Sequence, residues 1–264
     1  MSGVNVDAIA SRFERASEEV TAERRQVVDE RKALAAFAEQ VRGMDLPQVQ
    51  SRSVPAGLTR CGSGDGTEAV RDAYESTVMA VPHYETEYGE SYERHLAEEF
   101  GPNVASMLIG GHSFRDRHRE LLLQAVSTSR ERREQLIEVL RTEEQSLSET
   151  TPVLLSVAED LVGMAGGVET RDADLLDAYA RRLDVLEGKC TRTLERRQST
   201  LVHQRRDLGL SLDAFDLPTY LYAEFDVTYP VVSTIADLLD RLERLRTDIH
   251  RTLEYRSASA SRQS

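Results

Sequence analysis

The fold of this chain is decided by residues 4–42, which read VNVDAIASRFERASEEVTAERRQVVDERKALAAFAEQVR and contain neither proline nor glycine. Within this stretch, five apolar residues recur at intervals of seven: Phe13, Val20, Val27, Leu34 and Val41. Seven residues make just under two turns of an α-helix, so these side chains form one seam along the helix. We therefore predict a long helix that packs against other helices, with this seam as its candidate interaction surface.

The remainder of the chain has the same helical character. Apolar residues spaced three and four apart predict helices over 67–81, 84–100, 103–109, 113–147, 152–165, 172–208, 216–225 and 230–253. The Thr151-Pro152 pair is typical of a helix start, and it separates the helix over 113–147 from the next one. The sequence therefore predicts an all-α fold, an elongated antiparallel helical bundle with coiled-coil-like long helices.

Clusters of glycine and proline divide the chain. We expect a long N-terminal helix over residues 1–43, a flexible linker over 44–66, a helical bundle over 67–256 and a disordered tail over 257–264. A long loop inside a compact domain is uncommon, so the first helix is expected to be a semi-independent arm.

The charge balance is acidic and almost free of lysine. The chain has 46 Asp and Glu residues and a net charge of −13, and Lys32 and Lys189 are its only lysines. Such a composition is typical of halophilic archaea, where carboxylates hold water and hydrated cations, although a high-GC genome also favours arginine codons. At low salt the negative charge disfavours binding to nucleic acids and anionic membranes. At about 1 M salt the screening length falls to about 3 Å, so this repulsion is largely lost.

Localisation follows from a few absences in the sequence. Cys61 and Cys190 are the only cysteines, which argues against a disulfide framework and fits a reducing compartment. The first residues contain no basic and apolar leader, and no apolar run reaches the ~18 residues needed to cross a bilayer. We expect a cytoplasmic protein with no membrane insertion.

The sequence offers weak candidates for chemistry. No histidine has a carboxylate three residues before it, as di-iron bundles would require. The best metal candidates pair His83 with Glu87, and His95 with Glu98 or Glu99, but surface pairing is the favoured interpretation.

A stripe formed by Tyr84, Tyr88 and Tyr92 is better explained by packing than by an aromatic pocket. Cys61 beside Gly62, Gly64 and Gly66 matches no phosphate-binding loop. We expect no catalytic residue, no cofactor and no metal.

Arginine gathers in three clusters: Arg115, Arg117 and Arg119; Arg130, Arg132 and Arg133; and Arg192, Arg196, Arg197, Arg205 and Arg206. These side chains could bind phosphates, but each cluster lies among carboxylates that favour pairing within the helix. Arg197 differs because it occupies an apolar seam position and so needs a buried acidic partner. We expect that partner to be Glu23 or Glu30, in the middle of a second row on the first helix.

Two segments resemble a haloarchaeal family of helical proteins with no assigned function. One reads Thr219-Tyr-Leu-Tyr-Ala-Glu-Phe-Asp-Val-Thr-Tyr-Pro-Val-Val, and the other is the first helix, with Glu-Arg-Arg and Asp-Glu-Arg before Ala-Phe-Ala-Glu. The resemblance implies a halophilic archaeal origin and a helical fold, and it implies no activity.

Together these patterns predict a non-enzymatic scaffold, adaptor or regulatory protein that acts through protein–protein contacts. We expect a protein partner or a homodimer formed through the seam of the first helix. The alternative is a nucleic-acid-associated regulator that uses the arginine clusters of the helices over 113–147 and 172–208.

Overall fold

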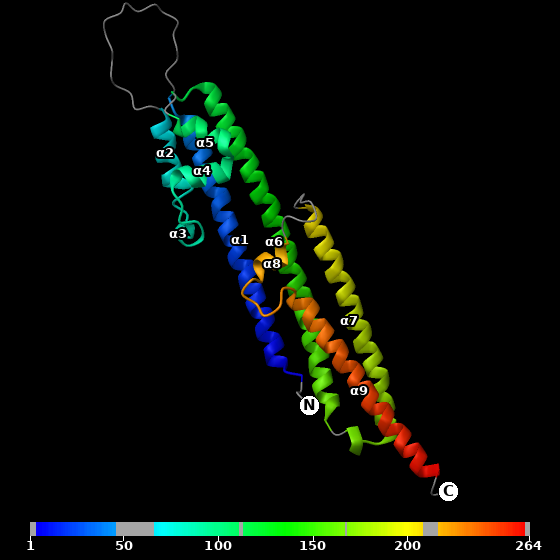
Figure 1. The fold of residues 1–264 in the computed structure, drawn as a ribbon. Helices are drawn as coiled ribbons and strands as arrows, with labels where there is room; N and C mark the ends of the chain where they lie inside the picture. The colour runs from blue at the N-terminus through cyan, green and yellow to red at the C-terminus, as the bar shows by residue number, and fades with distance from the viewer. Residues whose placement is uncertain (1–3, 46–65, 111–112, 167, 208–215, 262–264) are drawn as a thin grey trace, which may run out of the picture. The chain divides into compact units, whose positions relative to one another are not determined.

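The structure is a computed structural model, and it describes residues 4–45, 66–110, 113–166, 168–207 and 216–261 (Figure 1). All regular secondary structure in these ranges is helical, which confirms the all-α prediction. The elements are α1 (Val6–Gly43), α2 (Gly66–Thr77), α3 (Tyr84–Glu87), α4 (Tyr92–Phe100), α5 (Pro102–Ile109), α6 (Asp116–Ala165), η1 (Val168–Thr170), α7 (Ala173–Asp207), α8 (Leu217–Leu221) and α9 (Pro230–Ser261).

The long helices pack antiparallel, α1 against α6, α6 against α7 and α7 against α9. Polar pairs between α6 and α7 show the opposite running directions. Glu143 pairs with Arg197 at 2.7 Å, whereas Asp160, later in α6, pairs with Arg182, earlier in α7, at 2.6 Å. The antiparallel part of the bundle prediction is therefore confirmed.

The two helices predicted over 113–147 and 152–165 are in fact one helix, α6, with Pro152 inside it. Proline removes one backbone donor, but the loss is local, and the Thr151 hydroxyl donates to the Leu147 carbonyl at 2.7 Å. Leu147, Leu154 and Leu161 keep a seven-residue spacing across the proline, and all three are buried. Continuous burial of this row outweighs the missing hydrogen bond, so the helix continues.

The C-terminal boundary also differs from expectation. Helix α9 extends to Ser261, so residues 257–261, predicted to be disordered, are helical. This segment contains only serine and alanine and has neither glycine nor proline to end a helix. Of the linker predicted over 44–66, residues 46–65 lie outside the described ranges, and Gly66 is already the first residue of α2.

The chain divides into two compact units. Unit 1 consists of residues 1–23 and 139–264, and unit 2 consists of residues 24–138. Helices α1 and α6 each contribute residues to both units, so this division does not coincide with the predicted boundary after residue 43.

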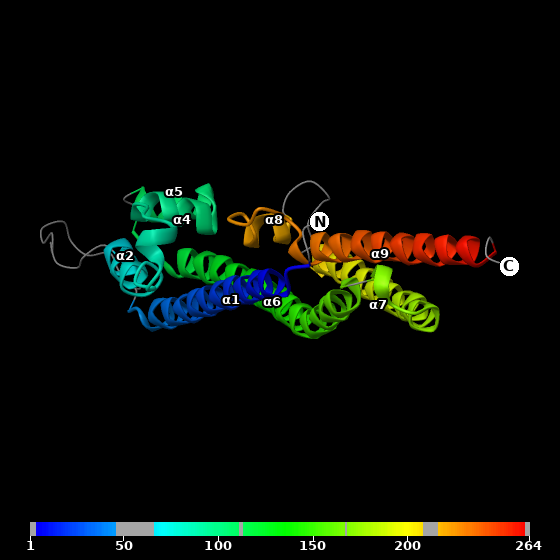
Figure 2. The same ribbon diagram turned by 90° about the horizontal axis from the view of Figure 1, so that it is seen from below.

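The core of unit 1 includes the facing sides of α7 and α9, which lie side by side in both Figure 1 and Figure 2. Their buried residues recur at helical spacing and include Leu176, Leu183, Leu186 and Cys190 on α7, and Ile235, Leu238, Leu242 and Ile249 on α9. The short helix η1 packs against α9. At the edge of this interface, Arg246 of α9 pairs with Glu187 of α7 at 2.5 Å.

The core of unit 2 is aromatic. Phe37 of α1 meets Tyr74 of α2 edge to face, with 5.2 Å between ring centroids, and Tyr74 meets Tyr92 of α4 in the same way at 5.6 Å. Edge-to-face contacts of this kind place the positive edge of one ring on the negative face of another. Helices α4 and α5 pack closely together, and α2 contacts α5.

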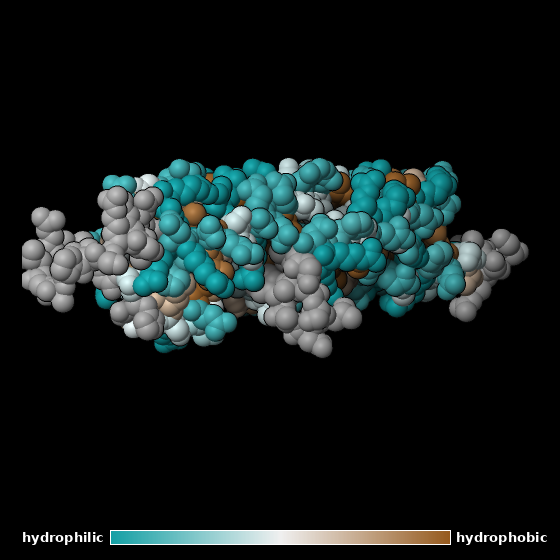
Figure 3. All heavy atoms as spheres, turned by 90° about the horizontal axis from the view of Figure 1, so that it is seen from above, coloured by the Kyte–Doolittle hydropathy of each residue, from teal (hydrophilic) through white to brown (hydrophobic). Residues whose placement is uncertain are grey.

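The molecular face drawn in Figure 3 is mostly hydrophilic, with apolar residues in scattered positions. Within the described ranges, no helix combines the length and the apolar character that a membrane crossing requires.

Candidate functional site

The seam of α1 is internal. Its five residues are at most 3% exposed: Phe13, Val20, Val27, Leu34 and Val41. Phe13 and Val20 belong to unit 1, and the other three to unit 2. The chain's own helices therefore cover the seam, and it does not form the free surface on which the predicted homodimer contact depends. A homodimer contact through the seam would require these residues to become exposed.

Unit 1 contains a buried ion pair that joins α6 to α7. Arg197 donates from Nη1 and Nη2 to the two carboxylate oxygens of Glu143, each at 2.7 Å. Gln204 Nε2 and the Tyr222 hydroxyl donate to the same carboxylate, at 2.8 and 2.6 Å. Glu143 is fully buried, and Arg197 is 2% exposed. A bidentate pair with extra donors is the geometry in which a buried carboxylate is tolerated.

The electrostatics of this cluster favour one protonation state. Burial by itself would raise the pKa of Glu143, but the hydrogen bonds from Arg197, Gln204 and Tyr222 outweigh it and hold the pKa below its ordinary value. The pKa of Tyr222 is raised by burial and by the charge of Glu143, so its hydroxyl remains a donor. Glu143 is therefore ionised and Arg197 charged at neutral pH.

The prediction for Arg197 is confirmed in one part and wrong in another. Arg197 does have a buried acidic partner, but that partner is Glu143 on α6, and the prediction of Glu23 or Glu30 was wrong. The sequence carried a signal for Glu143, which lies three residues after the buried Leu140 and four before the buried Leu147. A charge at an apolar position of α6 is the same anomaly that singled out Arg197 on α7.

Unit 2 has a second ion cluster, which includes Glu30. Arg133 of α6 donates to both carboxylate oxygens of Glu99 at 2.6 Å, and its Nε donates to Glu30 at 3.1 Å. The Tyr88 hydroxyl donates to Glu30 at 2.7 Å, and His83 Nε2 lies 3.1 Å from the same oxygen. His83 thus contacts Glu30, although the sequence suggested Glu87.

Aromatic rings surround His95 beside this ion cluster. The Tyr74 hydroxyl lies 2.8 Å from His95 Nδ1, and the rings of Tyr84 and Tyr88 lie 5.0 and 4.9 Å from the imidazole. Burial lowers the pKa of His95, and the nearby Arg133 lowers it further, although Glu99 opposes both. Neutral His95 can then accept a hydrogen bond from Tyr74, whose pKa burial raises.

The tyrosine stripe agrees with the packing interpretation. Tyr84 and Tyr92 are buried, whereas Tyr88 is 37% exposed. Burial raises the pKa of Tyr92 to about 12. Across the described part of the chain, no group of three or more His, Cys, Asp or Glu residues is placed to hold a metal ion.

The arginine clusters separate into paired and unpaired members. Several of them donate to carboxylates: Arg119 to Asp116, Arg133 to Glu99, Arg197 to Glu143 and Arg205 to Asp216. By contrast, Arg192 and Arg196 form no ion pair with any described residue. The apolar spacing distinguished Arg197 from the rest of the third cluster, but it did not indicate that Arg192 and Arg196 lack an ion pair among the described residues.

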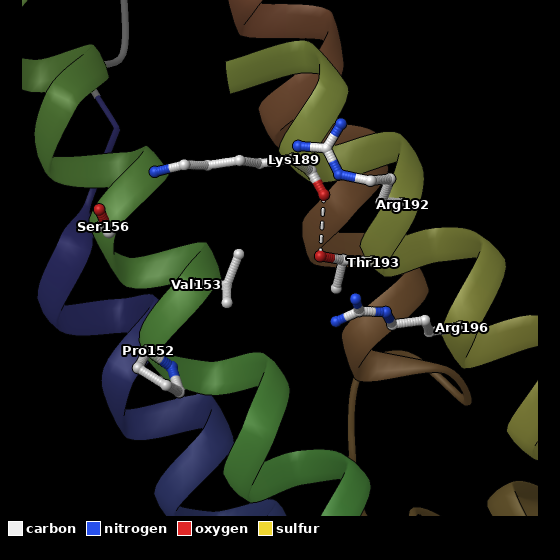
Figure 4. A pocket seen from close by; sticks show the side chains of 7 residues that line it. All are labelled: Pro152, Val153, Ser156, Lys189, Arg192, Thr193 and Arg196. Carbon is white, nitrogen blue, oxygen red and sulfur yellow. Dashed lines mark hydrogen bonds between the residues drawn. The ribbon is translucent and has the colours of Figure 1, made fainter. Parts of the chain in front are cut away.

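A hollow of about 400 Å³ lies between α6 and α7 in unit 1 (Figure 4). Helix α6 contributes Pro152, Val153 and Ser156, and α7 contributes Lys189, Arg192, Thr193 and Arg196. Figure 4 shows the Lys189 side chain extending from α7 toward α6, and the Arg196 guanidinium directed toward Val153. The hollow therefore has an apolar part on α6 and a cationic part on α7.

A second hollow of about 220 Å³ shares Val153, Thr193 and Arg196 with the first. It extends to Arg197, whose Nε is buried and has no hydrogen-bond partner among the described residues. Glu149 is the carboxylate in its lining, and Gln145 donates to it at 2.8 Å.

The described cysteine, Cys190, lines neither of these hollows. Cys190 is buried in the α7–α9 core, and desolvation together with the nearby Glu187 raises its pKa to about 11. A thiol with this pKa is protonated and unreactive at neutral pH. Cys61, Gly62 and Gly64 lie outside the described residues.

Comparison with known proteins yields one match. The model of a domain of unknown function (DUF7260) matches residues 11–246, which is most of the chain. No curated protein and no solved structure matches the chain.

Proposed function

The chain belongs to the family of this domain of unknown function (DUF7260), so we propose a function from its own residues: a non-enzymatic scaffold, adaptor or regulatory protein that acts through protein–protein contacts. The observation that carries this proposal is the division into two compact units that share α1 and α6. An adaptor requires more than one separate surface on a stable frame. Two units with their own packed residues meet that requirement.

The charged residues at apolar positions support the same proposal. Glu143 and Arg197 in unit 1, and Glu99 and Arg133 in unit 2, are engaged with each other. The Glu143–Arg197 pair is buried, and the Glu99–Arg133 pair is partly buried. The best-attested role of buried pairs is to fix which helices associate and in which register. These side chains bind each other and hold the helices together. The exposed surfaces are therefore the main part of the molecule left for function.

Unit 2 offers a surface with the composition of a protein interface. A hollow of about 420 Å³ between α4 and α6 has Phe100, Leu121 and Ala125 in its lining, with Glu98 and Arg132 also present. The Leu121 side chain is 45% exposed although it is large and apolar. Apolar residues surrounded by charged ones are typical of protein interfaces, and we propose that a protein partner contacts this surface.

Affinity capture with matched variants tests the proposal. The tagged full chain, Leu121→Asp and the control Val202→Asp would each be used to capture proteins from a lysate of the source organism at its native salt. Both leucine and valine are nearly half exposed, so neither change should unfold the protein. We expect one protein recovered in stoichiometric amount with the unmodified chain and with Val202→Asp, and lost with Leu121→Asp.

A protein recovered equally by all three baits would contradict the proposed surface, and recovery of no protein would contradict the adaptor function. If the recovered protein is a second copy of the chain, sedimentation of purified samples must show a dimer that Leu121→Asp dissociates.

We also propose that the source is a halophilic archaeon and that the protein is cytoplasmic. The support is the excess of Asp and Glu over basic residues, the presence of lysine only at positions 32 and 189, and the resemblance of residues 219–232 described above. Carboxylates at the surface retain hydration and counterions in concentrated salt, which keeps an acidic protein dissolved.

A nucleic-acid-associated regulator is the second candidate. Arg192 and Arg196 favour it, because they form no ion pair with any described residue and lie on the same helix as Arg205 and Arg206. This candidate predicts salt-dependent retention on immobilised DNA that weakens in Arg192→Gln/Arg196→Gln. Equal retention of this variant and the unmodified chain at every salt concentration would contradict it.

A further inference from the structure

We propose that the hollow between α6 and α7 in unit 1 binds a small phosphate-bearing molecule through Lys189, Arg192 and Arg196. This inference goes beyond the adaptor function and does not depend on it. It concerns a site for a small ligand, whereas the adaptor surface lies in unit 2.

The charges on α7 favour a bound anion. Lys189, Arg192 and Arg196 are spaced by three and four residues, so they lie on one face of α7. Like charges at this spacing repel each other. None of the three pairs with a carboxylate in the described part of the chain, although acidic residues outnumber basic ones by 46 to 33. Other arginines of the same interface are paired, such as Arg182 with Asp160. A bound anion would remove the repulsion that this face of α7 carries.

The donors around the hollow have the geometry that a phosphate group requires. A guanidinium group presents paired N–H donors that match two phosphate oxygens, and an ammonium group adds a point charge. Figure 4 shows the charged end of Lys189 close to α6, on which Ser156 also lines the hollow. Donors from both helices therefore lie around one space. The Thr193 hydroxyl already donates to the Lys189 carbonyl at 2.8 Å, so it is left to act as an acceptor.

The size and polarity of the hollow suit a small organic ligand. The hollow of about 400 Å³ falls within the range of ~300–1,000 Å³ that small-molecule sites occupy, and it is larger than a single ion needs. Pro152 and Val153 supply an apolar part of the lining. A molecule with a phosphate group and an uncharged ring, such as a nucleotide or a sugar phosphate, has the matching chemistry.

The adjacent hollow indicates how the ligand lies. Its lining includes Glu149, which would repel a phosphate, but also the buried Arg197, whose Nε has no hydrogen-bond partner among the described residues. We therefore place the phosphate near Lys189 and Arg192, with the uncharged part of the ligand extending past Arg196. The carboxylate of Glu149 and the hydroxyls of Thr150 and Thr200 line that second space.

A nucleic-acid strand fits this site less well. The neighbouring positions of α6 carry Glu149, Glu159 and Asp160, and the whole chain carries −13. A continuous phosphate backbone would place further phosphates beside these carboxylates, whereas a small ligand places its phosphate at the cations and only its uncharged part beside Glu149.

Isothermal titration calorimetry tests the site, with ATP and inorganic phosphate as probes and adenosine as the ligand without phosphate. The full chain would be titrated at a fixed KCl concentration at which circular dichroism shows it folded. Arg192→Gln and Arg196→Gln remove cations of the hollow, and Arg181→Gln removes an exposed cation of α7 that does not line it. All three variants change the net charge equally.

We expect saturable 1:1 binding of ATP, competition by inorganic phosphate, and no binding of adenosine. Each hollow variant should weaken ATP binding by about tenfold, the effect of losing one charge-assisted hydrogen bond, while Arg181→Gln changes it less than about twofold. The proposal is overturned by the absence of saturable binding up to about 10 mM ligand, or by equal weakening in Arg181→Gln. Binding of a single-stranded oligonucleotide without binding of ATP or phosphate would also overturn it.

Discussion

The carboxylate of Glu143 is the most completely enclosed charge in the described structure. It is fully buried and accepts hydrogen bonds from Arg197, Gln204 and Tyr222. Burying a carboxylate costs several kcal/mol, which the attraction to a well-placed arginine offsets. Such a pair contributes little net stability relative to apolar residues, but losing one partner leaves an uncompensated charge. Arg197 therefore offsets the cost of burying Glu143 and specifies the register of α6 against α7.

A double-mutant cycle tests this role. Arg197→Met leaves the buried Glu143 without its cation, so we expect it to lower the free energy of unfolding by ~3–5 kcal/mol. Glu143→Met/Arg197→Met removes both charges, and its loss should be smaller than the sum of the two single losses by at least about 2 kcal/mol. The measurement is urea unfolding at constant KCl concentration.

Arg196→Met is the matched control, because it changes the neighbouring, exposed arginine and should cost less than about 0.5 kcal/mol. If the two single losses of the cycle simply add, Glu143 and Arg197 are not energetically coupled, and the register role is wrong.

His95 should contribute to the pH dependence of the free energy of unfolding. Its pKa in the folded chain is lowered by burial, while the unfolded value is about 6.5. Above about pH 6.5 both states are neutral at this residue and the stability is complete. As the pH falls from about 6.5 through the lowered pKa, the unfolded chain binds a proton that folded His95 does not, so the free energy of unfolding decreases.

His95→Gln should reduce this decrease between about pH 7.5 and 5.5, because glutamine does not titrate. His250→Gln provides the control, because it makes the same chemical change at an exposed position. Urea midpoints at several pH values give the measurement. Identical slopes for the unmodified chain and His95→Gln would show that His95 does not contribute to this pH dependence.

Part of this residue-scale arrangement could be predicted from the sequence. The apolar spacing around Arg197 was sufficient to predict a buried acidic partner, because a charge in a seam has few alternatives. The spacing did not identify the partner, because a period of seven fixes the face of a helix and not the helix it meets. Glu30 shows the same limit: it was recognised as an acidic residue between apolar ones, but its partner is Arg133.

At the scale of elements, α6 differs most from the helix boundaries that its local sequence predicts. Thr151-Pro152 is a favourable helix start, yet the helix passes through it. Local preferences are worth a few kcal/mol at most, and burial of Leu147, Leu154 and Leu161 on one face is worth more. The extents of α1, α7 and most of α9 followed from periodicity, because no proline interrupts them. The packing of α6 against α7, which forms both hollows, depends on tertiary contacts that periodicity does not encode.

Replacement of Pro152 tests the continuity of α6. Alanine restores an N–H group that can bond to the Ser148 carbonyl and removes the ring from the helix interior, so Pro152→Ala should raise the free energy of unfolding by about 1–3 kcal/mol. Urea unfolding followed by the helical circular dichroism signal provides the measurement. A lower stability would show that the packing of α6 on α7 requires the geometry that proline imposes.

At the scale of the molecule, we expect the net charge to affect the free energy of unfolding more than any single contact does. The −13 charge is distributed over a chain that divides into two compact units, so much acidic surface remains exposed relative to the buried core. Self-repulsion destabilises the compact state, and salt screens it. The Debye length falls from about 10 Å at 0.1 M to about 3 Å at 1 M salt. Stability should therefore depend on salt far more strongly than in a protein near neutrality.

We expect the thermal midpoint to rise steeply between about 0.1 and 1 M KCl and more slowly above that, because screening is nearly complete when the Debye length is close to a contact distance. Glu14→Gln/Glu18→Gln/Glu19→Gln neutralises three exposed carboxylates of α1 and changes the net charge from −13 to −10. This variant should be more stable than the unmodified chain at 0.1 M KCl and should gain less from added salt. Sucrose, which is excluded from protein surfaces without screening charge, should stabilise both proteins equally. If the triple variant is instead less stable in 2 M KCl while matching the unmodified chain at low salt, the carboxylates act by binding hydrated cations, and screening is not the main cause. A midpoint independent of KCl would contradict both mechanisms and, with them, the proposed adaptation to concentrated salt.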